Sequence, residues 1–152
     1  MKIRKYNFED AEAHAEVHRQ SVRGIASKDY NKKEIEAWVK EDPEDEPLPE
    51  EKERFVAETE EDEIVGFSEY NKEEKELTGL YIKPEYSGTG LASQLLSKAE
   101  KAAKEGGIEK LNCTSTITAK EFYQRHGYEI LEKTAHKMEE QNLTVYKMQK
   151  EL

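Results

Sequence analysis

Residues 80–93, with the sequence LYIKPEYSGTGLAS, constrain the fold of this chain more than any other segment. A short apolar run leads into a turn that contains Gly88 and Gly90, and the turn opens a long amphipathic helix. Backbone N–H groups at the start of a helix have no partner inside the helix, and the helix dipole adds partial positive charge there. Glycine lets the backbone come close to a ligand. We therefore expect a strand–turn–helix unit that holds a phosphate group of a cofactor.

Hydrophobic periodicity outside this segment predicts further strands and helices. Strands are predicted at residues 2–6, 54–60, 63–71, 76–82, 110–114, 128–138 and 143–148. The predicted helices begin after Asn7, after Asn31, at the glycine turn and at Thr118, and they end near Ala26, Trp38, Gly106 and Gly127. Most neighbouring strands are joined by short polar turns, which favours antiparallel pairing. The predicted fold class is therefore mixed α/β, with a largely antiparallel sheet flanked by helices on both faces.

Local signals refine this order of elements. Asn31 with Glu34, and Thr118 with Glu121, have the spacing of a capping box at a helix start. The acidic stretch 41–53 contains three prolines and is predicted to be an exposed loop. The last two strands are predicted to form a hairpin that turns at Gln141 and Asn142.

Composition limits the class of protein. A length of 152 residues fits one domain spanning 1–152, and a net charge of -10 argues against a nucleic-acid partner. The single cysteine, Cys113, cannot form an internal disulfide, which suits a reducing cytoplasm, and we expect it to be a buried strand residue. The chain contains neither a signal-peptide pattern nor a long apolar run, so no membrane partner is expected.

Two motifs together resemble those of the GNAT superfamily of N-acetyltransferases. The glycine turn of that family is usually written Arg/Gln-x-x-Gly-x-Gly/Ala, and here it falls on residues 87–92 with Ser87 in the leading position. The second motif is an aromatic pair followed by glycine and another aromatic residue, which is met by Phe122, Tyr123, Gly127 and Tyr128. The resemblance covers nearly the whole chain and implies a GNAT-like fold. It also implies acetyl-CoA-dependent transfer of an acetyl group directly to a primary amine.

The resemblance assigns the cofactor site to the strand and turn described above. Strand backbone would pair with the pantetheine arm of acetyl-CoA, and turn amides would hold the pyrophosphate. The implied acetyl-CoA-binding residues are Leu80, Ile82, Ser87, Gly88, Thr89, Gly90, Leu91, Ala92 and Ser93. Ser87 removes a side-chain donor near the pyrophosphate without removing the amides.

Tyr123 is the candidate catalytic residue, because a phenol can protonate the departing CoA thiolate. Glu69 and Glu76 are candidates for the base that deprotonates the amine, and a chain of water molecules is the alternative. His14 and His18 lie on one helical face, but no third ligand accompanies them and no metal is expected.

The acceptor side of the site is less well defined by the sequence. His18, Tyr30 and Trp38 are candidates for a pocket that binds a small-molecule or peptide amine, and the net negative charge would favour a cationic acceptor. An exposed hairpin edge at residues 143–148 would allow a homodimer. Two alternatives remain open for the activity, namely a CoA-binding regulatory module without catalysis and an acyltransferase that uses a longer acyl-CoA.

Overall fold

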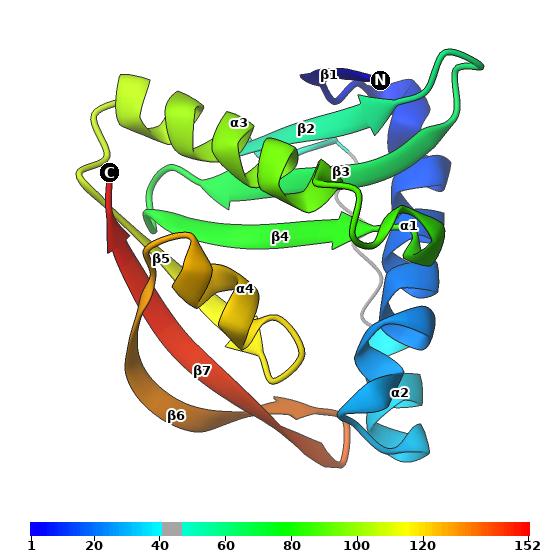
Figure 1. Cartoon of the computed structure of the whole chain (residues 1–152), viewed down its shortest axis with the longest axis vertical. Coiled ribbons are helices and arrows are strands. Elements are labelled where there is room, and N and C mark those ends of the chain that lie inside the picture. The colour runs from blue at the N-terminus through cyan, green and yellow to red at the C-terminus, as the bar shows by residue number, and fades with distance from the viewer. Residues whose placement is uncertain (41–46) are drawn as a thin grey trace.

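The structure, a computed structural model, describes residues 1–40 and 47–152. In this part of the chain, seven strands form one sheet with the order β1-β2-β3-β4-β5-β7-β6 (Figure 1). The strands are β1 (Lys2–Lys5), β2 (Lys52–Glu58), β3 (Ile64–Asn71), β4 (Glu76–Ile82), β5 (Lys110–Thr116), β6 (Glu129–Met138) and β7 (Gln141–Glu151). Neighbouring strands pair antiparallel, except that β4 and β5 are parallel.

Helices cover both faces of this sheet, as the sequence predicted (Figure 1). They are α1 (Ala11–Gly24), α2 (Lys32–Val39), α3 (Leu91–Glu105) and α4 (Lys120–Arg125), with 3-10 turns η1 (Phe8–Asp10), η2 (Ala26–Lys28) and η3 (Pro84–Tyr86). α3 packs on β2, β3 and β4, and α4 joins the same hydrophobic cluster as α3. α1 packs on β3 and β4 from the other face, and α2 lies against β7 and β6. The predicted mixed α/β fold class is confirmed.

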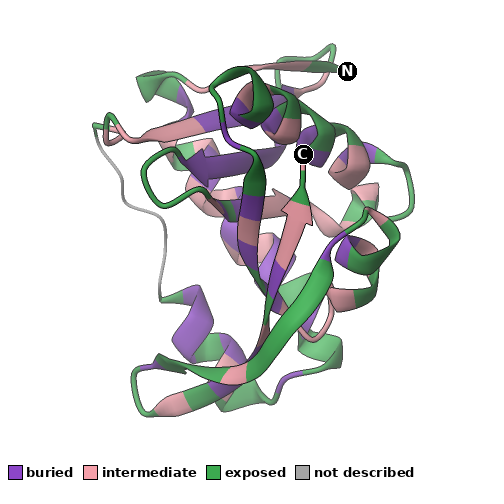
Figure 2. Ribbon diagram, turned by 90° about the vertical axis from the view of Figure 1, so that its left-hand side faces the viewer, coloured by how far each residue is buried: buried purple, intermediate pink, exposed green. Residues whose placement is uncertain are grey.

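β3 is the centre of the first half of the sheet, because all of its residues are buried. Successive side chains of a strand point to opposite faces. Gly66 lies against Leu95 of α3, whereas Phe67 packs with Val17 of α1. In contrast, β6 is an edge strand that is almost entirely exposed (Figure 2). The sheet therefore changes from a doubly covered centre to an open edge.

The apolar stripe of α3 explains its position on the sheet. Leu91, Leu95, Leu96, Ala99 and Ala103 are its buried residues, and their spacing places them on one side of a helix. The small alanines in the last turns let the helix axis approach the sheet closely. Leu91 and Leu95 share a hydrophobic cluster with Ile82, which places the start of α3 beside the end of β4.

β4 and β5 pair over only a short length. The register joins Glu76 to Asn112 and Leu77 to Cys113, and no later residue of β4 is paired with β5. The two strands separate beyond this point, so the backbone of β4 from residue 78 onward has an open side. This separation divides the sheet into a β1–β4 half and a β5–β7–β6 half (Figure 1).

Two local predictions were wrong. The hairpin between β6 and β7 turns at Glu139 and Glu140, because Met138 pairs with Gln141 and strand β7 begins there. Thr118 does not cap α4, since the N-cap residue is Ala119 and its N–H donates to Thr116 Oγ1 at 3.1 Å.

Other boundaries shifted without changing the fold. The capping box of Asn31 and Glu34 is present at the start of α2, as predicted. Lys52 and Glu53, at the end of the predicted acidic loop, already belong to β2, while residues 41–46 of that loop lie outside the described residues. Among the described residues, no helix combines the length and apolar character needed to cross a membrane.

The hydroxyl group of Tyr30 joins three separate parts of the chain. It donates to the carbonyl oxygen of Thr144 in β7 at 2.6 Å and accepts from the N–H of Ile117 at 2.9 Å. We predict that Tyr30→Phe lowers the free energy of unfolding by about 1–3 kcal/mol, because both backbone groups lose a partner. Urea unfolding would measure this loss.

Tyr146→Phe is the matched control for this substitution. The ring of Tyr146 lies under the Lys120 ammonium group, and phenylalanine keeps that contact. An equal loss of stability in both variants would contradict the bridging role of the Tyr30 hydroxyl.

Candidate active site

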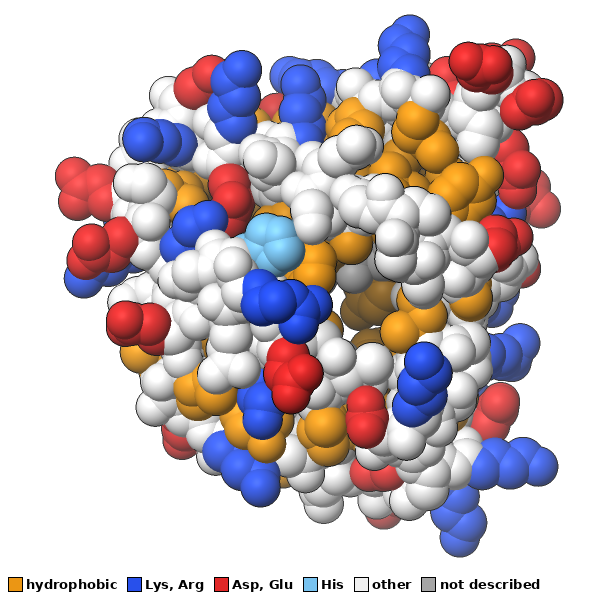
Figure 3. Space-filling model, in the orientation of Figure 1, with side chains coloured by type: hydrophobic (Ala, Val, Ile, Leu, Met, Phe, Trp, Pro, Cys, Tyr) orange, Lys and Arg blue, Asp and Glu red, His pale blue; other side chains and the backbone are white. Residues whose placement is uncertain are grey.

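A cleft of about 680 Å³ opens where β4 and β5 separate. Its walls come from both separated strands, from the glycine turn before α3, from α4 and from the end of α1 with the η2 turn. Figure 3 shows this hollow on the front face, with hydrophobic side chains at its floor and Lys or Arg side chains on both sides. The cleft joins an unpaired strand edge to a helix start, so it can hold an extended molecule that ends in phosphate groups.

The glycine turn forms the end of the cleft beside α3. Gly88 and Gly90 have φ angles of 77° and 86°, a region that favours glycine, and both line the cleft. The first backbone bond at the start of α3 runs from the Gln94 N–H to the Gly90 carbonyl at 3.1 Å. The N–H groups of Ala92 and Ser93 therefore have no partner inside the helix and lie at the positive end of its dipole.

A close approach of α1 to η3 holds this end of the cleft in place. A Cβ atom at Gly24 would lie 2.4 Å from Cγ of Pro84, so only glycine lets the two segments come this near. Ile25, which follows, packs in the same hydrophobic cluster as Tyr86. The end of α1 and the turn before α3 therefore form one continuous wall.

Tyr123 lies on the opposite wall, in α4. It lines the cleft and is 7% exposed, and its ring packs edge-on against Phe122 and Tyr128. Burial raises the pKa of Tyr123 well above its ordinary value. The phenol therefore stays protonated throughout the physiological range and can act only as a proton donor in that range.

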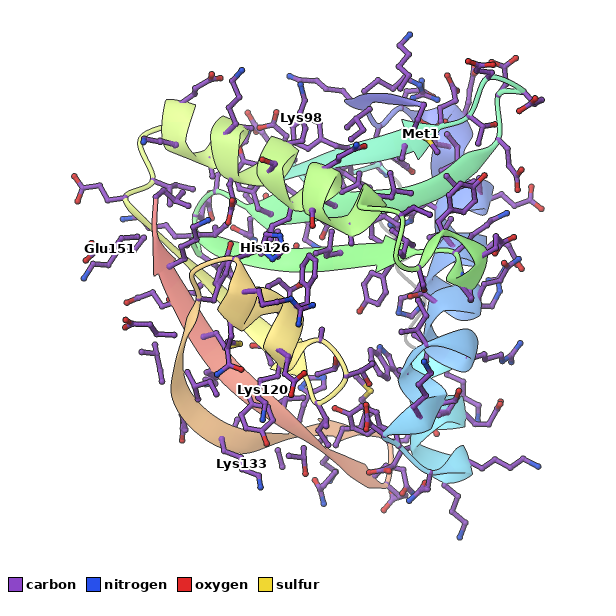
Figure 4. The ribbon with its side chains drawn as sticks, viewed as in Figure 1. Met1, Lys98, Lys120, His126, Lys133 and Glu151 are labelled. Atoms are coloured by element: carbon purple, nitrogen blue, oxygen red, sulfur yellow. The ribbon has the colours of Figure 1, made fainter. Side chains whose placement is uncertain are left out.

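His126 and Arg125 also line the cleft, and the motif analysis gave neither of them a role. Ser93 Oγ and His126 Nε2 are 3.0 Å apart, and His126 Nδ1 lies 2.8 Å from the Phe122 carbonyl oxygen. Figure 4 shows His126 between α4 and α3. This contact brings the second sequence motif directly against the first turn of α3. For Arg125 and His126, the sequence signal was their position between Tyr123 and Gly127 of the aromatic–glycine motif.

The two candidate bases do not line the cleft. Glu69 is buried and accepts from Arg54 Nε at 2.7 Å and from Thr78 Oγ1 at 2.7 Å, while Arg54 Nη2 completes the pair at 2.5 Å. Glu76 lies where β4 and β5 are still paired, and it accepts from Thr114 Oγ1. Burial raises the pKa of Glu76. The geometry gives Glu69 a structural role and places Glu76 at the closed end of the strand pair.

The candidate acceptor residues lie near one another but only Trp38 lines the cleft. Tyr30 packs edge-on against Trp38 with ring centroids 5.7 Å apart, and His18 packs edge-on against Tyr81 at 4.9 Å. Tyr81 itself lines the cleft, so His18 lies one layer behind the wall. These three residues come from α1, α2 and the segment between them, and whether they bind the acceptor stays a prediction.

Of the implied acetyl-CoA residues, seven line the cleft. These are Leu80, Ile82, Ser87, Gly88, Gly90, Ala92 and Ser93. Thr89 turns away and its hydroxyl donates to the Tyr86 carbonyl, whereas Leu91 is buried against the sheet. Cys113 is buried, as expected, and burial raises the pKa of its thiol to about 12, so it is not a nucleophile near neutral pH. No metal-holding group of His, Cys, Asp or Glu was found in residues 1–40 and 47–152.

Comparisons with known proteins agree with this geometry. The family model described as an acetyltransferase (GNAT) domain matches residues 26–152. A curated relative, spermidine N(1)-acetyltransferase from Thermoplasma acidophilum, is 30% identical over 145 residues, which cover 86% of this chain and 89% of that protein. This chain belongs to the GNAT family of acetyltransferases. It is an acetyl-CoA-dependent N-acetyltransferase, as the resemblance implied.

Solved structures show the same fold. PaiA N-acetyltransferase from Thermoplasma acidophilum, solved in complex with coenzyme A, is 27% identical with a TM-score of 0.79 and matches over 99% of this chain and 98% of that chain. A GCN5-related N-acetyltransferase from Rhodopseudomonas palustris has a TM-score of 0.91 at 24% identity, with 99% of this chain and 95% of that chain covered. The second likeness concerns the fold alone.

The contacts of Glu69 give a test of its structural role. We predict that Glu69→Gln lowers the free energy of unfolding by about 3–5 kcal/mol, because the buried Arg54 guanidinium loses the carboxylate that accepts from its Nε and Nη2 atoms. At a temperature where the variant remains folded, kcat should stay close to that of the original protein. Thermal unfolding and steady-state acetylation assays would measure the two quantities.

Glu63→Gln is the control, since Glu63 pairs with Lys83 at the surface and its side chain is 55% exposed. Such a pair contributes at most about 1 kcal/mol. A Glu69→Gln variant of normal stability with a large loss of kcat would assign the base to Glu69 after all.

Proposed function

We propose that this chain moves an acetyl group from acetyl-CoA directly to a primary amine of a small molecule or peptide, in the cleft between β4, β5, α1 and α4. The observation that carries the proposal is the position of an unpaired β4 edge beside the start of α3. An extended pantetheine arm needs backbone partners along its length, and a pyrophosphate needs amides at its end. Both kinds of partner face the same cleft.

Residues on two walls would hold acetyl-CoA. The β4 backbone at Leu80 and Ile82 would pair with the pantetheine arm, and the amides of residues 88–93 would hold the pyrophosphate. Ser87 contributes no positive charge where the family usually has Arg or Gln. Arg125 lines the cleft from α4 and has no carboxylate partner in the described part of the chain. Its guanidinium would supply the missing charge to the CoA phosphates.

Tyr123 would complete the transfer. The amine nitrogen attacks the thioester carbonyl carbon, the carbon–sulfur bond breaks, and the leaving thiolate takes the Tyr123 hydroxyl proton. The nitrogen loses one proton as the amide forms, and water would return a proton to the Tyr123 oxygen. A protonated phenol on the cleft wall supports this role. The amine must lose a proton before it attacks, and no carboxylate lines the cleft in the described residues, so water would remove that proton.

The acceptor and the setting of the enzyme are further parts of the proposal. The curated relative is named for spermidine, which makes a polyamine one acceptor to be tested. The chain would act in the cytoplasm as a single unit spanning 1–152, without a nucleic-acid or membrane partner. A homodimer would use the edge strand β6, because β7 is paired on both sides.

Gly90 provides a test of the acetyl-CoA site. We predict that Gly90→Ala raises the dissociation constant for acetyl-CoA about tenfold or more, because its Cβ would point into the open cleft at a positive φ. Calorimetric titration with acetyl-CoA would measure this change, with CoA, NAD and ATP as comparison ligands.

Gly107→Ala is the matched control at the other end of α3. Its φ is 92° and a Cβ there would also meet open space, but Gly107 does not line the cleft. Both variants carry the same backbone strain, so only the loss specific to Gly90 reports on the ligand. Equal affinities in the two variants, or a preference for NAD or ATP, would overturn the proposed cofactor site.

Tyr123 provides a test of catalysis. We predict that Tyr123→Phe lowers kcat by about 100-fold or more while the dissociation constant for acetyl-CoA stays nearly unchanged, because only the proton donor is lost. Since the pKa of Tyr123 is raised, its ionisation should cause no fall in kcat on the alkaline side below about pH 10. Thiol release between pH 6 and 10 would test both statements. An undiminished kcat in the variant would remove Tyr123 from the mechanism.

A further inference from the structure

The walls of the cleft carry a charge opposite to that of the whole protein. The chain contains 34 Asp and Glu residues among 152, so acidic side chains make up more than a fifth of it. None of the 27 described residues that line the cleft is acidic. The charged residues among them are Lys28 and Arg125, accompanied by His126. A cleft with this composition is suited to anions on both of its walls.

Neither of these two cations is neutralised within the described part of the chain. Every other arginine forms an ion pair with a carboxylate: Arg4 with Asp10, Arg19 with Glu16, Arg23 with Glu36 and Arg54 with Glu69. Arg125 has no such pair, and neither has Lys28. Among the described residues, Arg125 differs from the other arginines in this respect, and it shares with Lys28 a cleft that no acidic residue lines. This arrangement favours an anionic ligand.

Lys28 lies on the wall formed by the end of α1 and the η2 turn. The segment around it packs beside Tyr86 through Ile25 at one end and is bonded to Ile117 through the Tyr30 hydroxyl at the other. The end of β5 and the loop after it lie beside this segment and add Thr116 and Thr118 to the lining. The buried Oγ1 atom of Thr118 has no hydrogen-bond partner in residues 1–40 and 47–152. A cation and a buried hydroxyl donor therefore face the same space.

A polyamine acceptor fits these walls poorly. A second ammonium group entering beside Lys28 would meet a like charge, and no carboxylate among the described lining residues balances it. The amine that reacts must also arrive neutral, and within residues 1–40 and 47–152 no acidic side chain lines the cleft to take its proton. At pH 7.5, about a quarter of a peptide α-amine is neutral, against about one in a thousand of a lysine-type amine.

We infer that the cleft selects a primary amine on a molecule that also carries an acidic group, and that Lys28 recognises this group. The inference rests on the proposed function and narrows its acceptor. Ala-Glu, Ala-Gln and Ala-Lys are suitable acceptors for the test, because they share one α-amine and differ in side-chain charge.

The experiment compares kcat/KM for the three dipeptides and for spermidine with the original protein, Lys28→Gln and Lys28→Glu. The original protein should prefer Ala-Glu to Ala-Gln, and Ala-Gln to Ala-Lys, by about threefold to tenfold at each step. Lys28→Gln should abolish the preference, and Lys28→Glu should reverse it. Since Lys28 is an exposed side chain, all three proteins are expected to fold equally well.

KM for acetyl-CoA separates the two possible sources of the anion. It should be unchanged in both Lys28 variants if the anion belongs to the acceptor. A rise in this KM with an unaltered order of dipeptides would assign Lys28 to a CoA phosphate and overturn the inference.

Other outcomes also decide the question. Spermidine acetylated faster than Ala-Glu would overturn the inference while leaving the proposed function intact. Binding of acetyl-CoA without acetylation of any of the four amines would likewise overturn it. Failure to bind acetyl-CoA at all would instead refute the proposed function, because the binding titration does not involve the acceptor.

Discussion

The short pairing between β4 and β5 is the constraint on which the rest of the structure depends. The two strands are joined only at Glu76–Asn112 and Leu77–Cys113, and a hydrophobic cluster that includes Leu77 and Cys113 packs around this closed end. The same cluster takes in residues of α3, α4 and β7, so it fastens both halves of the sheet at one point. Beyond that point β4 and β5 no longer pair with each other, and the cleft opens between them. A fully paired sheet would satisfy these backbone groups and leave no space for an extended ligand.

Patterns that are local in the sequence predicted the order of helices and strands well. They did not predict contacts between residues that lie far apart in the chain. The order of elements and the position of α3 follow from the glycine turn at Gly90 and the apolar stripe that follows it. The predicted Thr118 capping box is absent because α4 begins one residue later, with Ala119 as its N-cap residue, and spacing alone does not show this shift. The hairpin turn moved because Glu139 adopts a positive φ, which few non-glycine residues do.

The same distinction separates the parts of the site that the sequence could and could not predict. Turn residues such as Gly88 and Ser93 belong to one continuous motif, and they do line the cleft. Glu69 shows the limit, because its pairing with Arg54 depends on the register between β2 and β3. Lys28 belongs to none of the sequence motifs, and its place in the cleft is known only from the structure. Net charge does not describe the composition of the cleft, since the acidic residues that dominate the total do not line it in the described structure.

The contact between Ser93 and His126 shows why two motifs separated by about thirty residues act as one site. His126 lies at the C-cap of α4, and its Nδ1 atom is 2.8 Å from the Phe122 carbonyl oxygen. A carbonyl oxygen only accepts, so Nδ1 carries the proton in the neutral ring and Nε2 accepts from the Ser93 hydroxyl. This chain of contacts ties the first turn of α3 to the helix that carries Tyr123 and Arg125. The contact thereby links the amides that would hold the phosphates to the helix whose phenol would protonate the thiolate, and a single ligand must reach both.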